Sequence, residues 1–169
     1  MGGTMSTLYA ALFDRPVLKN LVYLAAPIDF NRAGTYDVWL KAPGYDPDRI
    51  ADTMELVPKS FIDWGTRMLN PLANYWGTYT RLWKTLEEGK PVHFWKVLNK
   101  WSSDNINFPG GAYRDWIRDF YQGNKLIKNQ VVLRGKRVQL QRIKANILAM
   151  VGLRDHIVMP HQTAAALTY

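Results

Sequence analysis

The chain has 169 residues, of which 47% are hydrophobic, a size and composition typical of one globular domain. It contains no cysteine, which excludes disulfides and thiolate metal sites within these residues. No run of about 18 apolar residues occurs, so the sequence predicts no membrane-spanning helix. The first residues show no signal-peptide pattern. The three histidines are too scattered to predict a metal centre, and we expect no cofactor.

The formal charge of +8 comes from one part of the chain. Between Phe120 and Arg154 there is no Asp or Glu, and eight cations in this stretch equal the whole surplus. These cations are Lys125, Lys128, Arg134, Lys136, Arg137, Arg142, Lys144 and Arg154. They could form a surface for nucleic acid, a membrane or a phosphate-bearing substrate. Their alternation with apolar residues favours a solvated hairpin face instead. No recognition helix accompanies them, so we expect no nucleic-acid partner.

The first predicted elements are a helix and a short strand. Four apolar residues at helical spacing predict a helix over residues 5–13, which Pro16 would end. These four residues are Met5, Leu8, Tyr9 and Leu12. The apolar run 21–26 then predicts a strand buried on both faces, as in a parallel sheet. A helix followed by such a strand is half of a βαβ unit.

A helical and strongly aromatic insertion follows, over residues 36–124. Three helix starts are predicted where a proline follows an Asp, Val or Asn, because proline suits the first turn of a helix. The pairs are Asp46-Pro47, Val57-Pro58 and Asn70-Pro71. Two shorter helices are predicted near 92–101 and 112–120, with a loop at 107–111 between them. A helical insertion of this kind often serves as a cap over a site.

The helix after Asn70 carries one apolar stripe over four turns, and Gly89 and Pro91 end it. The stripe consists of Leu72, Tyr75, Trp76, Tyr79, Leu82, Trp83 and Leu86. We expect its aromatic residues Tyr75, Trp76, Tyr79 and Trp83 to pack between helices. Lining an apolar acyl channel is the alternative role.

Sheet character returns in the last part of the chain. Val131–Leu133 and Val138–Leu140 flank a basic turn and predict a β-hairpin. The apolar run 147–152 predicts a second buried strand. Asp155 lies just past its C-terminal end, where ligands bind in open α/β sheets.

The two ends of the chain indicate one chemistry. Gly2-Gly3 before an apolar helix suits the second half of a G-x-S-x-G nucleophile elbow. In that register the nucleophile precedes Met1, whose backbone N–H would be an oxyanion-hole donor. Asp155 would orient a catalytic histidine that follows the chain. The alternatives are an ordinary glycine loop and an Asp that satisfies a turn through its own backbone. His156 and His161 lie too close in sequence to Asp155 to be its partner.

Short motifs occur in a characteristic order along the chain. In the first part they are Gly2-Gly3-Thr4, Leu8-Tyr9-Ala10-Ala11-Leu12, Val17, Asn20-Leu21-Val22 and Pro27-Ile28-Asp29-Phe30. Asn74-Tyr75-Trp76, Lys100-Trp101 and Phe108-Pro109-Gly110 follow. The last are Phe120-Tyr121-Gln122-Gly123-Asn124-Lys125-Leu126 and Asp155-His156-Ile157-Val158-x-Pro160. This order resembles the poly(3-hydroxyalkanoate) synthases, and most closely the catalytic subunit of the two-component, short-chain type.

The resemblance implies a partial α/β-hydrolase fold with an inserted helical cap. Residues 1–35 would belong to the core, 36–124 to the cap, and 125–169 to the core again. The resemblance also implies an acyltransferase that polymerises 3-hydroxyacyl-coenzyme A into a polyester through an acyl-cysteine, with Asp155 as the acid. It further implies a second synthase subunit, a homodimer, and a cytoplasmic location at the surface of polyester granules.

Three points stay open at the level of sequence. A serine hydrolase of the same fold, such as a polyester depolymerase or an esterase, would share the pattern, because the residue before Met1 decides between cysteine and serine. Arg134, Lys136 or Arg137 could help to attract the phosphates of coenzyme A. We also expect an internal piece of an enzyme that is inactive and poorly folded alone, because nucleophile, histidine and the early core strands fall outside it.

Overall fold

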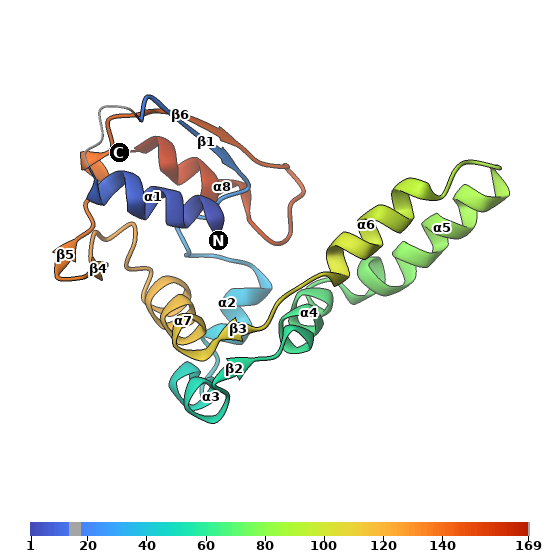
Figure 1. The fold of residues 1–169 in the computed structure, drawn as a ribbon, viewed down its shortest axis with the longest axis horizontal. Coiled ribbons are helices and arrows are strands. Elements are labelled where there is room, and N and C mark those ends of the chain that lie inside the picture. The colour runs from blue at the N-terminus through green and yellow to red at the C-terminus, as the bar shows by residue number, and fades with distance from the viewer. Residues whose placement is uncertain (14–17, 169) are drawn as a thin grey trace. The chain divides into compact units, whose positions relative to one another are not determined.

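The computed structural model describes residues 1–13 and 18–168 (Figure 1). Pro16, predicted to end the first helix, and Val17, one of the resembling residues, lie outside the described residues. The chain divides into two compact units. Unit 1 contains Met1–Pro47 and Asp115–Tyr169, and unit 2 contains Asp48–Arg114. Unit 2 lies inside the predicted insertion 36–124 but is shorter at both of its ends.

The predicted first helix is present as α1, which runs from Gly2 to Leu12. Its buried face consists of Thr4, Thr7, Ala10 and Ala11. The apolar stripe that predicted the helix is therefore not its buried face, and Met5 and Tyr9 are exposed. Small side chains replace the expected large ones because α1 approaches the neighbouring strand very closely: a Cβ on Gly3 would overlap the Cβ of Ala26.

Both predicted strands are present and pair with each other. β1 spans Asn20–Leu24 and β6 spans Asn146–Met150. They are parallel, with Leu21 opposite Ile147 and Leu24 opposite Met150. The parallel pairing agrees with the predicted parallel sheet, and a long crossover connects β1 to β6. The βαβ unit expected around α1 stays a prediction.

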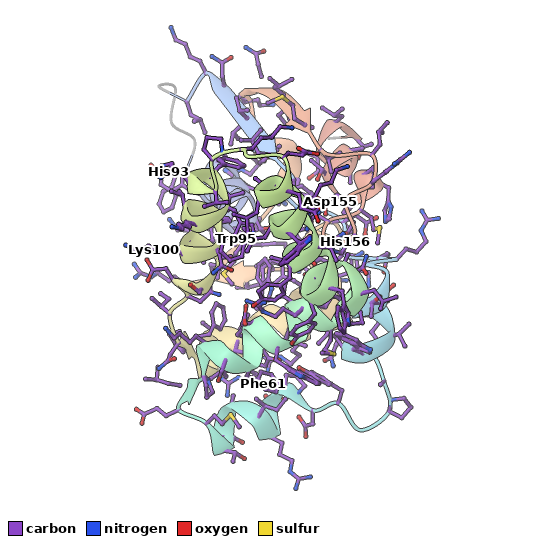
Figure 2. All side chains as sticks on the ribbon, turned by 90° about the vertical axis from the view of Figure 1, so that its right-hand side faces the viewer. Phe61, His93, Trp95, Lys100, Asp155 and His156 are labelled. Carbon is purple, nitrogen blue, oxygen red and sulfur yellow. The ribbon has the colours of Figure 1, made fainter. Side chains whose placement is uncertain are left out.

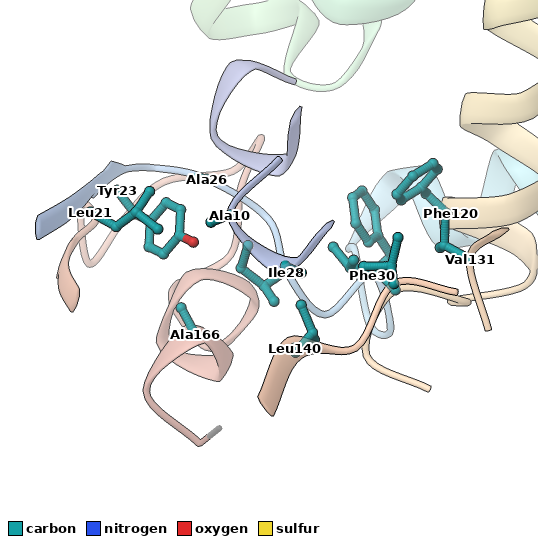
Figure 3. Packing of buried hydrophobic residues seen from close by; sticks show 13 residues of the cluster. Ala10, Leu21, Tyr23, Ala26, Ile28, Phe30, Phe120, Val131, Leu140 and Ala166 are labelled. Carbon is teal, nitrogen blue, oxygen red and sulfur yellow. The ribbon is translucent and has the colours of Figure 1, made fainter. Parts of the chain in front are cut away.

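The prediction that these strands are buried on both faces is wrong. Leu21 and Tyr23 are buried with Ala10, Ala11 and Ala166 (Figure 3). The opposite face carries Val22, Leu24, Leu148 and Met150, all exposed. Helix α8 (Pro160–Ala164) and the 3₁₀ turn η4 (Ala165–Thr168) cover the same face as α1 (Figure 1). Among the described residues nothing covers the other face, so side chains alternate between buried and exposed.

The rest of unit 1 extends this core. Phe30 packs edge-on against Trp116, Phe120 and Tyr121, with ring centroids 5.1–5.5 Å apart. These three rings belong to η2 (Trp116–Gln122), a wide helical turn that continues α7 (Gly110–Asp115). Helix α2 (Thr35–Leu40) lies against η2. Leu126, Val138 and Leu140 complete the core and are fully buried.

The predicted hairpin is present, with β4 (Val132–Leu133) antiparallel to β5 (Lys136–Arg137). Its second strand was predicted too late in the chain: β5 falls in the predicted turn, and Leu140 begins the 3₁₀ turn η3 (Leu140–Arg142). The two linking residues, Arg134 and Gly135, both have positive φ, 49° and 75°. Such a two-residue turn matches the twist of a hairpin.

Unit 2 contains most of the helices predicted for the insertion. They are α3 (Pro47–Thr53), α4 (Lys59–Met68), η1 (Leu72–Trp76), α5 (Gly77–Glu87) and α6 (His93–Ser103). The three proline-marked helix starts are confirmed, and Gly89 follows α5 with φ 62°. The insertion is not all helical, because β2 (Leu56–Val57) pairs with β3 (Phe108–Pro109) where a loop was predicted.

The predicted helix–helix packing of the aromatic stripe is wrong. Trp76 and Trp83 are 72% and 66% exposed, and α5 has no buried residue. Contact between α5 and α6 is limited, with the rings of Tyr79 and Trp95 6.4 Å apart. Figure 2 shows Trp95 on the side of α6 that faces α5.

In the described part of the chain, no helix is both long and apolar enough to cross a membrane.

Candidate functional site

The candidate site lies where β1 and β6 end. Because the two strands are parallel, their carboxyl ends meet at one edge of the sheet. Asp155 lies in the loop that follows β6, and residues 25–34 follow β1. The N-terminal end of α1 reaches the same edge, since Gly3 contacts Ala26 and the Thr4 hydroxyl donates to the carbonyl of Pro27 at 2.9 Å. Figure 1 shows these three segments at one end of unit 1.

Asp155 forms a tight turn with the residues that follow it. Its Oδ1 accepts hydrogen bonds from the backbone N–H groups of Ile157 at 2.8 Å and Val158 at 3.0 Å. Its own N–H donates to the carbonyl of Gly152 at 3.0 Å. The turn that the sequence analysis gave as the alternative role of Asp155 is therefore present. The turn also fixes the half-buried Asp155 carboxylate, and a catalytic acid needs a fixed carboxylate. The role of Asp155 as a catalytic acid stays a prediction.

Met1 lies at the amino end of α1, next to the carboxyl end of β1. It is the N-cap residue of α1, and its carbonyl accepts the N–H of Met5 at 3.0 Å. The positive end of the helix dipole is directed toward this edge and would favour negative charge there. The oxyanion role of the Met1 backbone also stays a prediction.

The two loops at this edge are locked together by Gln162, which sequence reasoning missed. Gln162 is only 1% exposed. Its backbone carbonyl accepts the N–H groups of Ile28 at 2.9 Å and Asp29 at 3.2 Å. Its side-chain Oε1 accepts the N–H of Met159 at 2.9 Å. A Gln three residues after the N-cap Met159, with Pro160 between, is a capping-box signal that could have identified it.

Other residues considered from sequence lie apart from Asp155 or show no site. His156 is exposed and follows Asp155 in the loop (Figure 2). His161 faces the carbonyl of Asn31 through Nε2 at 3.0 Å. Within residues 1–13 and 18–168, no group of three or more His, Cys, Asp or Glu side chains could hold a metal ion.

Part of the basic segment lies at the opposite end of α1 from Asp155, whereas Arg154 directly precedes Asp155 in the chain. Arg142 and Lys144 line a small hollow together with Ala10 and Phe13 at the carboxyl end of the helix. An 11-residue helix is about 16 Å long, so this hollow is well separated from the edge that carries Asp155. The hairpin residues Arg134, Lys136 and Arg137 are exposed. The structure therefore does not group these cations with the candidate site.

Comparison with known proteins gives one consistent result. The chain is 37% identical to the poly(3-hydroxyalkanoate) polymerase subunit PhaC of Haloferax mediterranei over 161 residues, 95% of this chain and 32% of the relative. It is 35% identical to the PhaC subunit of Synechocystis sp. over 170 residues, 97% of this chain and 44% of the relative. The resemblance to the poly(3-hydroxyalkanoate) polymerases is confirmed.

The match to the polymerases covers nearly all of this chain but less than half of each relative. The PhaC subunit of Allochromatium vinosum is 31% identical over 165 residues, 97% of this chain and 46% of the relative. The chain thus spans 32–46% of the length of these curated polymerases. No family model matches the chain. No solved structure matches it either, so the mixed α/β architecture rests on the present structure.

Proposed function

We propose that this chain is a segment of a poly(3-hydroxyalkanoate) polymerase, and that it supplies Asp155 as the acid of the catalytic triad. The similarity to PhaC subunits over 95% of the chain carries the proposal. The position of Asp155 after the carboxyl end of β6 supports it, because triad acids occupy such loops in α/β-hydrolases. The relatives named above are polymerases, so the hydrolase alternative is not favoured.

The reaction would be acyl transfer from a coenzyme A thioester. A cysteine preceding Met1 would pass its proton to a histidine and attack the thioester carbonyl carbon. Coenzyme A would leave as a thiolate and take that proton from the histidine. The hydroxyl of a second acyl group would then attack the acyl-cysteine, again through the histidine, and form the ester bond while the cysteine is regenerated.

The residues of this chain would position the catalytic histidine and stabilise the charges that develop during the reaction. Asp155 would orient the histidine and stabilise its charged form. The Met1 N–H and the amino end of α1 would stabilise the negative oxygen of the tetrahedral intermediate. Residues 36–124 would serve as a helical cap with a partly apolar lining. A second subunit, a homodimer and a location at polyester granules belong to the same proposal.

Asp155→Asn in the polymerase tests the role of the acid. Asn keeps an Oδ1 that can accept the N–H groups of Ile157 and Val158, so the loop should keep its shape. It cannot stabilise a charged histidine, and we expect turnover with a 3-hydroxyacyl-coenzyme A to fall by about 10²-fold or more. Turnover within about twofold of the parent would reduce Asp155 to a turn residue and overturn the proposed role.

A further inference from the structure

Asn124 is a buried polar residue at the point where the chain leaves η2. It is 1% exposed and has a left-handed backbone, with φ 48°. Its N–H closes the helical turn on the carbonyl of Phe120 at 2.9 Å. Asn tolerates this conformation better than most residues. Backbone geometry alone would also admit glycine, so it does not explain why an amide side chain is present.

Both polar atoms of the Asn124 side-chain amide form hydrogen bonds. Oδ1 accepts the N–H of Phe30 at 2.9 Å, and Nδ2 donates to Oδ1 of Asp29 at 2.7 Å. Phe30 is fully buried, so its N–H has no access to water as an alternative partner. The same Oδ1 of Asp29 accepts the N–H of Asn31 at 2.9 Å. One amide thus fixes two consecutive residues of the segment after β1, and through Asp29 it is linked to a third.

This segment is bonded in turn to the loop of Asp155. Ile28 and Asp29 donate their N–H groups to the carbonyl of Gln162, whose side chain holds the N–H of Met159. Gly34, in the continuation of the same segment, lies against Met159, since a Cβ on Gly34 would be 2.6 Å from the Met159 Cε. The hydrogen bonds form a continuous chain from Asn124 through Asp29 and Gln162 to Met159.

We propose that Asn124 is a positioning residue that holds the Asp155 loop in place through Asp29 and Gln162. Its importance for catalysis rests on the proposed function, whereas the mechanical linkage does not. An amide is needed because one group must accept from an N–H and donate to a carboxylate. Alanine would leave the Phe30 N–H unpaired, and aspartate would set a second carboxylate against Asp29.

Hydrogen exchange of the whole chain tests the linkage without any need for activity. In Asn124→Ala we expect the N–H groups of Ile157, Val158 and Met159 to exchange about tenfold faster than in the parent. Asn129→Ala is the matched control: Asn129 also has positive φ, 54°, and its Oδ1 accepts the N–H of Leu140 at 2.8 Å. That bond lies outside the Asp155 loop, so the loop exchange should stay unchanged. Equal effects of both variants, or none in Asn124→Ala, would overturn the proposal.

A swap of the two side chains separates the specific bond from general damage. Asn124→Asp should destabilise the chain, and adding Asp29→Asn should restore most of the loss. In the double variant, the carboxylate introduced at position 124 can accept both the N–H of Phe30 and an N–H of the amide introduced at position 29. If residue 124 only filled space, the second substitution would not restore stability. Failure of the second substitution to rescue the first would contradict the proposed bond.

The single variant Asn124→Asp should also respond to pH. Two facing carboxylates raise the pKa of the introduced group, so its stability cost is small at low pH and grows as the pH rises through the raised pKa. Other charged groups nearby are His161, which faces Asn31, and Lys125, whose Nζ is paired with Asp119 at 2.7 Å. A destabilisation that does not change between pH 4 and pH 8 would show that Asp29 does not face residue 124.

Kinetics of the polymerase complete the test. We expect Asn124→Ala to lower kcat more than it changes KM, and the swap to recover kcat, because the acid rather than the substrate site is displaced. If Asn124→Ala speeds up the loop exchange but the unsubstituted parent shows no acyl transfer, the proposed function is refuted and the linkage is still supported. Unchanged kcat together with faster loop exchange would refute the catalytic importance of the linkage.

Discussion

Gly3 of α1 and Ala26, which follows β1, are in direct contact, and a Cβ on Gly3 would overlap the Cβ of Ala26. This contact brings the amino end of α1 to the edge of the sheet that carries Asp155. A glycine is required here because nothing larger than hydrogen fits between helix and strand.

Gly3→Ala should therefore destabilise the chain by about 1–3 kcal/mol, because the added methyl forces α1 away from the sheet. Gly2→Ala is the control, since a Cβ on Gly2 has no neighbour within 4 Å. It should change stability by no more than about 0.5 kcal/mol. Urea unfolding of both variants measures the difference; equal stabilities would show that α1 does not pack as closely as described.

Asp155→Ala and Asp155→Asn should differ in stability. Alanine removes the acceptor of two N–H groups, at Ile157 and Val158, and should cost about 1 kcal/mol because the loop is partly exposed. Asparagine keeps an acceptor and should cost less. Thermal unfolding of the pair separates the turn role of the side chain from its charge. If both variants match the parent, the turn bonds contribute nothing to stability.

Tyr121 should make the chain sensitive to alkaline pH. Burial raises its pKa, and repulsion from Tyr36 raises it further. A raised pKa means that the folded state favours the neutral phenol, so stability is retained below the unfolded value near 10 and lost as the pH rises above it. Tyr121→Phe should reduce this loss between about pH 9 and pH 11. Tyr79→Phe is the control, because the Tyr79 side chain is largely exposed, and this substitution should not reduce the loss of stability.

Asp119 should affect stability at acidic pH. Burial opposes its ionisation, but hydrogen bonds from Lys125 at 2.7 Å and Arg118 at 3.2 Å outweigh that effect and lower its pKa. Its contribution is therefore present above the unfolded pKa near 3.8 and is lost as the pH falls through the lower folded value. Asp119→Asn should cost about 0.5–1 kcal/mol at pH 7, since the ion pairs are partly exposed. The cost should fall toward zero near pH 2, as acid unfolding curves would show.

Arg134 occupies a turn position that suits asparagine better. Its φ of 49° precedes Gly135 at 75°, and Asn-Gly is the favoured pair for such a turn. Arg134→Asn should stabilise the chain by about 0.5–1 kcal/mol in urea unfolding. Arg137→Asn, which lies in β5 outside the turn, should give no gain. A loss of stability in Arg134→Asn would mean that the arginine side chain has a structural role.

The elements with strong local signals were predictable from sequence. Proline at Pro47 and Pro58 and glycine at Gly89 restrict the backbone directly, so the helix boundaries near them follow from local chemistry. The parallel strands were recognisable as short apolar runs. Asp155 was identified because it follows such a run. The relation to the polymerases also came from sequence, since motifs in order are properties of the chain.

Which faces are buried was not predictable from these patterns. Met5 and Tyr9 lie on the apolar stripe of α1, yet Thr4 and Thr7 are buried, because close contact with β1 selects small residues. Val22 and Leu24 look like buried strand residues but are exposed, because burial depends on what covers a sheet and not on the strand.

The sequence alone thus determined most of the elements, the family resemblance and the candidate acid, since each depends on local conformational preference or residue identity. The tertiary structure decided how that acid is held. Asn124, Asp29 and Gln162 are far apart in the chain, and hydrogen bonds between them exist only once the chain has folded. Such long-range contacts leave no periodic or local signal, which is why the support of the Asp155 loop became visible only in three dimensions.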